Sequence, residues 1–303
     1  MMQLIPPGTK IDFVRYRNIA LVTSWILIMI GVGTMIIRGG PNYGIDFAGG
    51  ALVQVRFSQP TRVDDVRGAL ATIELSSDSI QDMGGGTNEF LVRLPLMAGK
   101  EEEATKTVTA ALQSKFGADK VEILRVEAVG PRVGAALRQR AVLAVLFATL
   151  MMGTYIWIRF EWRFGLGAAV ALIHDVLITI GALALWNYEF DLTIVAALLT
   201  IVGFSVNDTV IVSDRIRENM RKDRRSPLAG VINRSINETL SRTILTTGTA
   251  LLVVVTLYVL GGNVIHGFAF TLLVGFIVGT YSSVYIASPI VLFFERRPVP
   301  RRA

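Results

Sequence analysis

The sequence predicts a polytopic α-helical membrane protein with six transmembrane helices and a ferredoxin-like α+β extracytoplasmic domain between helices one and two. The first observation behind this prediction is composition: of 303 residues, 52% are hydrophobic and only 18% are charged, whereas soluble domains carry about a quarter charged residues. The second is a series of long apolar runs. The third is a single polar stretch, residues 38–140, which is neutral because it holds 13 basic and 13 acidic residues.

Six apolar runs have close to the roughly 20 residues that are needed to cross about 30 Å of hydrocarbon. They are Asn18–Ile37, Ala141–Ile158, Phe164–Trp186, Leu192–Val212, Ser241–Leu260 and Gly267–Phe294. The first run follows a tail, residues 1–17, and is longer than the apolar part of a cleaved signal peptide. Since no small-x-small cleavage site follows it, we expect a retained signal-anchor helix.

Lys and Arg residues in the short loops predict the orientation, because cytoplasmic loops carry the excess of positive charge. Three lie in the N-terminal tail, two in residues 159–163, eight in residues 214–242, four in residues 295–303, and none in residues 187–191 or 261–266. We therefore expect both termini and the basic loop 214–240 in the cytoplasm of a bacterial-type cell. Residues 38–140 are then outside the inner membrane, and residues 141–294 form a five-helix bundle.

The polar stretch has its own alternation of strand and helix patterns. Strands are expected at Ala51–Phe57, Ser79–Met83, Glu89–Leu96 and Val121–Val129, and helices at Val63–Glu74 and Glu101–Phe116. The order β-α-β-β-α-β is that of the split βαβ, ferredoxin-like domain. Three consecutive glycines at residues 84–86 fit a hairpin turn between the two middle strands.

The composition argues against several classes of function. The chain has no cysteine and two histidines, which excludes thiolate metal sites and argues against a histidine-rich zinc site. Its basic residues lie in short blocks beside apolar runs, so we expect no nucleic-acid partner. No H-E-x-x-H, G-x-S-x-G or paired G-x-G-D motif occurs, so we expect no enzyme activity, no metal and no cofactor.

Asp208 is the clearest case of an ionisable residue inside an apolar run. Its presence there requires a functional or structural explanation, because a charge in hydrocarbon is costly. Counted at about 1.5 Å per residue, it lies in the inner half of the fourth span, and Arg242 of the fifth span lies within about 5 Å of the same depth. An arginine side chain can cover that difference. We interpret Asp208 as a group that takes up and releases a proton, with Arg242 as its movable counter-charge. The alternatives are a static ion pair, or a cap at a helix break together with Asn207.

His174 and Asp175 lie near the middle of the third span. Neighbouring residues point about 100° apart on a helix, so we do not expect the two side chains to face one point, although they could serve successive steps of a proton path. An interhelical hydrogen bond that fixes packing is the alternative. Hydroxyls on spans four and five could carry further hydrogen bonds or serve as packing contacts: Ser205, Thr209, Thr246, Thr247 and Thr249.

Three long segments stand out from the apolar background: GIDFAGG at residues 44–50, VGFSVNDTVIVSDRIREN at 202–219 and SINETLSRTILTTG at 235–248. They closely resemble the signature segments of the SecF family, the smaller half of the SecDF protein-export complexes in the resistance-nodulation-division superfamily. The resemblance covers nearly the whole chain. It implies a subunit that pairs with SecD, associates with SecYEG, YajC and YidC, and uses the proton-motive force to draw unfolded precursor proteins out after the ATP-driven SecA stage.

The resemblance also implies roles for single residues. The functional aspartate and arginine of the family fall on Asp208 and Arg242. Asp46 matches a motif residue at the junction between the first span and the external domain. The glycines of that motif, Gly44, Gly49 and Gly50, suit a tight, hinge-like backbone, and an ordinary turn is the alternative.

Protonation of Asp208 would then bias spans four to six between two packings, and the first span with Asp46 would transmit the change to the external domain. One alternative function is a half-size proton-coupled exporter of small molecules of the resistance-nodulation-division type, and another is a scaffold with inert polar groups. Whether protons or sodium ions couple the cycle stays open, since a lone carboxylate with hydroxyl neighbours suits either.

Overall fold

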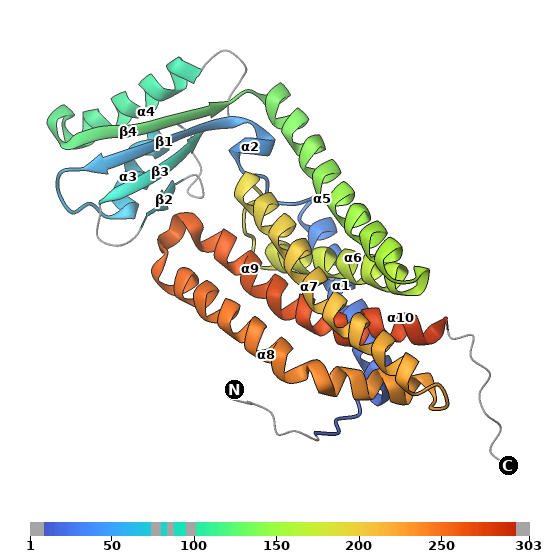
Figure 1. Ribbon diagram of the computed structural model, residues 1–303. Helices are drawn as coiled ribbons and strands as arrows, with labels where there is room; N and C mark the ends of the chain where they lie inside the picture. The colour runs from blue at the N-terminus through green and yellow to red at the C-terminus, as the bar shows by residue number, and fades with distance from the viewer. Residues whose placement is uncertain (1–8, 74–79, 84–87, 95–100, 295–303) are drawn as a thin grey trace.

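The computed structural model describes residues 9–73, 80–83, 88–94 and 101–294 and has two parts (Figure 1). A bundle of long helices forms the larger part, and a small α/β domain lies at one end of it. The chain leaves the bundle after its first long helix, builds the small domain and returns through α5. The predicted fold class, a membrane bundle with an α+β insert, is confirmed.

Within the described residues, six helical segments are long and apolar enough to cross a membrane. They are α1 (Arg17–Ile37), α5 (Pro131–Arg159), α6 (Trp162–Leu185), α7 (Leu192–Lys222), α8 (Leu228–Leu260) and the segment that begins with α9 (Gly262–Ser282). α5 begins ten residues before the expected run at Ala141. The stretch 214–240, expected as a loop, is mostly helical, because α7 and α8 continue until they meet at residues 223–227.

The sixth span is not a uniform α-helix. After α9 a π-helical turn covers Ser283–Ala287, and α10 (Ser288–Phe293) follows. Pro289 has no N–H to donate to the carbonyl four residues earlier, which favours a wider turn at this point. The hydroxyl of Ser288 donates to the carbonyl of Ser283 at 2.9 Å and so satisfies one backbone acceptor that the irregular turn leaves open.

The small domain contains one four-stranded antiparallel sheet with strand order β2-β3-β1-β4. Its strands are β1 (Gly50–Phe57), β2 (Ile80–Asp82), β3 (Glu89–Leu94) and β4 (Val121–Val129). The helices α3 (Val63–Leu70) and α4 (Glu101–Phe116) share one apolar core with alternate residues of β1 and β3, so both cover the same face. This is the predicted ferredoxin-like order. The expected glycine turn at residues 84–86 and the last two residues of the expected strand to Leu96 lie outside the described residues.

α6 is the central helix of the bundle, because it contacts α1, α5, α7 and α9. α1 packs against it at Gly31 and Gly181, where a Cβ atom built on Gly31 would lie 2.5 Å from the Cα atom of Gly181. Real Cβ atoms do not approach backbone this closely, so only glycine at Gly31 allows the two helices to meet. Exposed apolar side chains on α1, α5 and α8 face outward, as expected for helices that contact lipid.

Substitution of Gly31 by leucine should separate α1 from α6 and destabilise the protein by about 1–3 kcal/mol, the usual cost of overpacking a close contact. Gly33→Leu is the matched control, because no atom lies within 4 Å of a Cβ at Gly33. The measurement is the thermal unfolding midpoint of the two variants in the same detergent. Equal midpoints would show that the close approach of the helices does not contribute to stability.

Candidate functional site

The carboxyl group of Asp208 is buried on α7 between α8 and α9, with 1% of the residue exposed. Its Oδ2 atom lies 3.5 Å from the hydroxyl oxygens of both Thr247 on α8 and Thr280 on α9. These two hydroxyls are 2.8 Å from each other. The Oδ1 atom has no hydrogen-bond partner among the residues that the structure describes. Since hydrogen bonds near 3.5 Å are weak, this carboxyl group is poorly satisfied for its depth in the bundle.

Arg242 does not form the close pair with Asp208 that the sequence predicts as one alternative. Within the described part of the chain no hydrogen bond or ion pair joins the two, although Arg242 interacts with Asp208 electrostatically. The reason is the direction of the side chain. Arg242 is exposed, while its neighbour Thr243 is on the face of α8 that is turned into the bundle. The positions of Asp208 and Arg242 along their helices would allow contact. The rotation of α8 about its own axis prevents it, because the Arg242 side chain points out of the bundle.

α8 instead presents a line of buried hydroxyl groups toward the bundle. Its members are spaced four residues apart: Ser235, Thr239, Thr243 and Thr247. The line runs from the end of α8 next to residues 223–227 to Thr247, which lies beside Asp208. At the first position the side-chain amide of Asn219 donates to the hydroxyl of Ser235 at 3.0 Å. The hydroxyl of Thr243 has no partner among the described residues. Of the threonines singled out in sequence, Thr247 belongs to this line, while Thr249 is exposed.

His174 and Asp175 form a direct contact, which corrects the expectation that they cannot face one point. His174 Nδ1 and Asp175 Oδ1 are 2.9 Å apart, because both side chains turn toward each other from adjacent positions on α6. The other carboxylate oxygen of Asp175 accepts hydrogen bonds from Ser205 on α7 at 2.6 Å and from Ser282 on α9 at 2.8 Å. Unlike Asp208, this aspartate is fully hydrogen-bonded.

Asn207 lies on the exposed side of α7, away from Asp208, so it does not share a helix cap with that residue. It belongs to a row of small or polar residues on the outer face of α7: Thr193, Ala196, Thr200, Gly203 and Asn207. The spacing of three or four residues places them on one side of the helix. Small and polar residues on an outer face of a membrane helix are typical of contacts with another helix rather than with lipid.

The segment that carries Asp46 is bound to the beginning of α7. Asp46 Oδ2 accepts a hydrogen bond from the backbone N–H of Leu192 at 3.0 Å, next to Asp191, which caps Ile194 at 2.8 Å. The backbone N–H of Gly44 donates to the carbonyl of Phe190 at 2.8 Å. Asp46 therefore holds the first residue of the helix that carries Asp208.

Two glycines of this segment adopt backbone conformations that other residues rarely adopt. Gly49 has φ +79°, and a Cβ atom there would lie 2.8 Å from the Cα atom of Pro131 at the start of α5. Gly50 has φ +155°, and its Cβ would lie 2.9 Å from the carbonyl oxygen of Leu94. Gly44 has an ordinary negative φ of −68°. The close approaches make this junction a tight one in the described structure.

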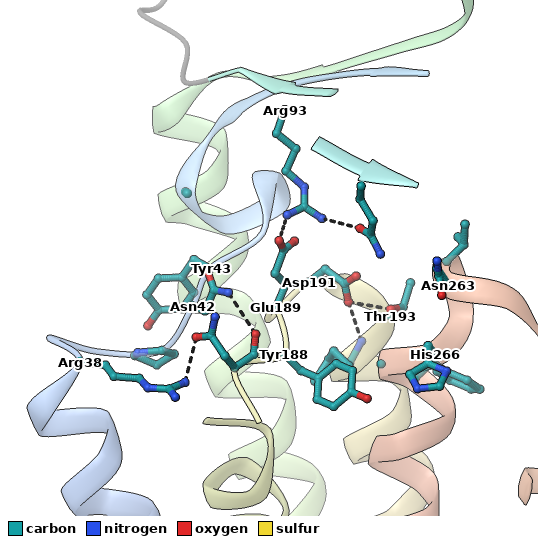
Figure 2. A pocket seen from close by; sticks show the side chains of 18 of the residues that line it. Arg38, Asn42, Tyr43, Arg93, Tyr188, Glu189, Asp191, Thr193, Asn263 and His266 are labelled. Atoms are coloured by element: carbon teal, nitrogen blue, oxygen red, sulfur yellow. Dashed lines mark hydrogen bonds and ion pairs between the residues drawn. The ribbon is translucent and has the colours of Figure 1, made fainter. Parts of the chain in front are cut away.

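A polar cleft of about 1030 Å³ lies between the small domain and the loops at the same end of the bundle (Figure 2). Two contacts cross it. Arg93 on β3 forms an ion pair with Glu189, as Figure 2 shows. The side-chain amide of Asn263 donates to the carbonyl of Asp82 at 2.6 Å. Burial lowers the pKa of the Arg93 guanidinium, and the charge of Asp191 opposes this shift. Among the described residues, no cluster of three or more His, Asp or Glu side chains could hold a metal ion.

Comparison with known proteins places these features in one family. Residues 107–297 match the model of the C-terminal part of the protein export membrane proteins SecD/SecF, and residues 35–61 match that of the SecD/SecF GG motif. The protein translocase subunit SecF of Desulfurispirillum indicum is 46% identical over 293 residues, which cover 95% of this chain and 92% of the relative. That of Vibrio alginolyticus is 42% identical, with 96% and 92% covered. The chain belongs to the SecF family.

Solved structures of SecDF have the same fold. A SecDF from Thermus thermophilus is 37% identical and matches with a TM-score of 0.83 over 98% of this chain. A SecDF in a super-membrane-facing form is 36% identical and matches with a TM-score of 0.72 over 97% of this chain. In both cases the match covers 40% of the SecDF chain, so the SecF-family chain spans less than half the length of those proteins.

The GG motif of the SecF family, residues 35–61 here, coincides with the junction around Asp46, Gly49 and Gly50. Other contributors to the two buried acid sites are invisible in the sequence. Ser282 and Thr280 lie in a span that also holds Ser283 and Ser288, whose hydroxyls bond within their own segment. The rotation of each helix about its axis decides which hydroxyl contacts an aspartate, and no local sequence pattern predicts this rotation.

The ion pair across the cleft should hold the small domain against the bundle. Arg93→Glu places two carboxylates opposite each other and should increase hydrogen–deuterium exchange in residues 187–191, and adding Glu189→Arg should reverse most of the increase, with a coupling of about 1 kcal/mol. Arg125→Glu, which changes an exposed arginine on β4, is the control. Equal exchange in the single and double variants would contradict a role for this pair in docking.

Proposed function

We propose that this SecF-family chain, together with SecD, uses the proton-motive force to complete Sec-dependent protein export across the cytoplasmic membrane after the SecA ATP-driven stage. The observation that carries the proposal is the state of Asp208. It is an ionisable group buried in a membrane-spanning helix, with one carboxylate oxygen unpartnered and the other weakly bonded. Intramembrane carboxylates of this kind mark ion pathways, because a purely structural role does not compensate their desolvation.

The separation of Arg242 from Asp208 supports a movable counter-charge rather than a static ion pair. A fixed pair would hold the carboxylate charged in every state of the protein. With Arg242 exposed on α8 and linked to Asp208 only by longer-range electrostatics, a rotation of α8 would bring the guanidinium closer or move it away. Each position favours a different protonation state of Asp208, as a proton-driven cycle requires.

The line of hydroxyls on α8 supports access of protons to Asp208 from the side of residues 223–227. Ser235, Thr239, Thr243 and Thr247 follow one face of the helix to the carboxyl group. The excess of Lys and Arg at that end favours a cytoplasmic location for it and for both termini, and an extracytoplasmic one for residues 38–140. Protons entering at Asp208 from the outside would leave along this line. His174 and Asp175 would contribute a second part of the path.

α7 supports the coupling between the proton site and the external domain. It carries Asp208, and its outer end is capped by Asp46 of the junction segment. A change in the packing of α7 would therefore reach the external domain through Asp46, Gly49 and Gly50. SecYEG, YajC, YidC and unfolded precursor proteins are proposed as further partners on the strength of the family resemblance.

The first test is Asp208→Asn, which keeps the size of the side chain but cannot bind and release a proton. Export driven by an imposed proton gradient in vesicles that also contain SecD, SecYEG and SecA should fall at least about tenfold, while ATP-driven export remains. Asp214→Asn, an exposed aspartate on the same helix, is the control. Full gradient-dependent export by Asp208→Asn would end the proposal, and a response to a sodium gradient alone would replace the proton as coupling ion.

The second test concerns the outer face of α7 as the contact with SecD. Gly203 is exposed on that face with no atom within 4 Å of a Cβ, so Gly203→Leu should fold normally yet prevent close helix approach. We expect the fraction of SecD that copurifies in detergent to fall severalfold. Gly33→Leu on α1 is the control. Undiminished copurification would place the SecD contact on another face.

A further inference from the structure

A chain of hydroxyl groups continues from His174 to α1 on the side away from Asp175. His174 Nε2 lies 2.9 Å from the hydroxyl oxygen of Ser24. Ser24 donates to the hydroxyl oxygen of Tyr281 at 3.2 Å, and Tyr281 donates to the backbone carbonyl of Ala20 at 2.7 Å. Ser24, His174 and Asp175 are each at least nine-tenths buried. The contacts of His174 therefore lie inside the bundle, and Tyr281 at the end of the chain of hydroxyls is half-buried.

The direction of each hydrogen bond in this chain follows from what each group can donate. The carbonyl of Ala20 can only accept, so it takes the single hydroxyl proton of Tyr281. Ser24 must then give its own proton to the Tyr281 oxygen. The Ser24 oxygen can only accept from His174, which requires a proton on Nε2 of the imidazole.

This assignment leaves one proton for the contact between His174 Nδ1 and Asp175 Oδ1. At 2.9 Å two bare acceptors would repel each other, so a proton lies between them. If it sits on the nitrogen, the two residues form an imidazolium and a carboxylate. If it sits on the oxygen, both are neutral. In either form the histidine–aspartate pair, His174 and Asp175, has zero net charge, which suits its depth in a membrane bundle.

We propose that the histidine–aspartate pair binds one exchangeable proton as a unit, at a site separate from Asp208, and that Ser24 and Tyr281 position His174 for it. When the proton leaves to water, the pair gains a charge of −1 and the imidazole must carry its one remaining proton on Nδ1 to keep the contact. Nε2 then needs a donor, so Ser24 has to break its bond to Tyr281. The proton site itself does not depend on the proposed function. Only the use of its proton in export rests on that proposed function.

The groups around the pair make it a closed site. α1 contributes Ser24, α7 contributes Ser205, and α9 contributes Tyr281 and Ser282. Among these described polar contacts Tyr281 is the titratable side chain, and the carboxyl group of Asp208 lies about one helical turn beyond Ser205 on α7. Because the four contacts come from three different helices, a change of proton on the pair alters hydrogen bonds that join α1, α7 and α9 to α6.

Histidine nitrogen NMR can test the assignment directly, because the chain has two histidines. The full chain is labelled with ¹⁵N-histidine, reconstituted with SecD in nanodiscs and titrated from about pH 5 to about pH 10. His266→Asn identifies the His174 signals, and infrared spectra of Asp175→Asn identify the Asp175 carboxyl band. We expect a proton on Nε2 at low pH and a single step in which the His174 and Asp175 signals change together. Separate steps, no step, or an unprotonated Nε2 at low pH would overturn the inference.

Tyr281→Phe tests the positioning role. Without the tyrosine oxygen, Ser24 is free to donate to Nε2, which stabilises the unloaded state. The common step should therefore move to lower pH by about one unit, the value of one hydrogen bond. Tyr285→Phe is the matched control, since its ring lies 5.1 Å from that of Tyr281 and its hydroxyl has no hydrogen bond to the described residues.

If the Tyr281→Phe variant folds and its common titration step stays at the wild-type pH, the positioning role is refuted. If the variant does not fold, the wild-type titration alone tests the proton site. The same titration in Asp208→Asn separates the two proposals. A step that persists there supports the second site whatever happens to export. A step that disappears would show that the proton belongs to Asp208 and would overturn the inference.

Discussion

The cost of placing ionisable groups in hydrocarbon is the constraint on which the membrane part of this structure depends. In the described part of the chain two aspartates, Asp175 and Asp208, are buried in the bundle, and their hydrogen bonding differs. Asp175 is fully hydrogen-bonded by a histidine and two serines, so its site has no net charge when one proton is bound. Asp208 has one unpartnered oxygen and two long hydrogen bonds. The first arrangement joins α1, α7 and α9 to α6 through hydrogen bonds, and the second leaves a buried carboxyl group with incomplete hydrogen bonding.

Helix α7 connects these two acid sites to the small α+β domain. Ser205 on α7 donates a hydrogen bond to Asp175, Asp208 follows about one turn later, and Asp46 caps the first residue of the helix. α9 can follow α7 closely because Gly279 has no side chain, and a Cβ there would lie 3.0 Å from that of Ser205. The small domain contacts the same end of the bundle through the pairs Arg93–Glu189 and Asp82–Asn263. A shift of α7 therefore changes contacts with both acid sites and with the domain.

The exposed face of α7 explains why the chain suits a larger assembly. Its row of small and polar residues has no partner helix within the described residues, although lipid contact favours apolar side chains. Relatives of this family are named translocase subunits, and in the solved SecDF structures the match covers 40% of a longer chain. The face that this chain leaves polar lies on the same helix as Asp208, which is buried on the opposite side.

The six spans and the β-α-β-β-α-β order of the small domain could be predicted from the amino-acid sequence, because hydropathy and alternation are local properties of the chain. Tertiary structure alone decided which side chains meet. It turned Arg242 outward, brought His174 and Asp175 together, and selected Ser24, Thr280, Tyr281 and Ser282 from many similar residues. The physical reason is that the rotation of a helix follows from packing along its whole length. Close contacts such as that of Gly31 with Gly181 fix this rotation, and no single segment of the sequence contains both sides of such a contact.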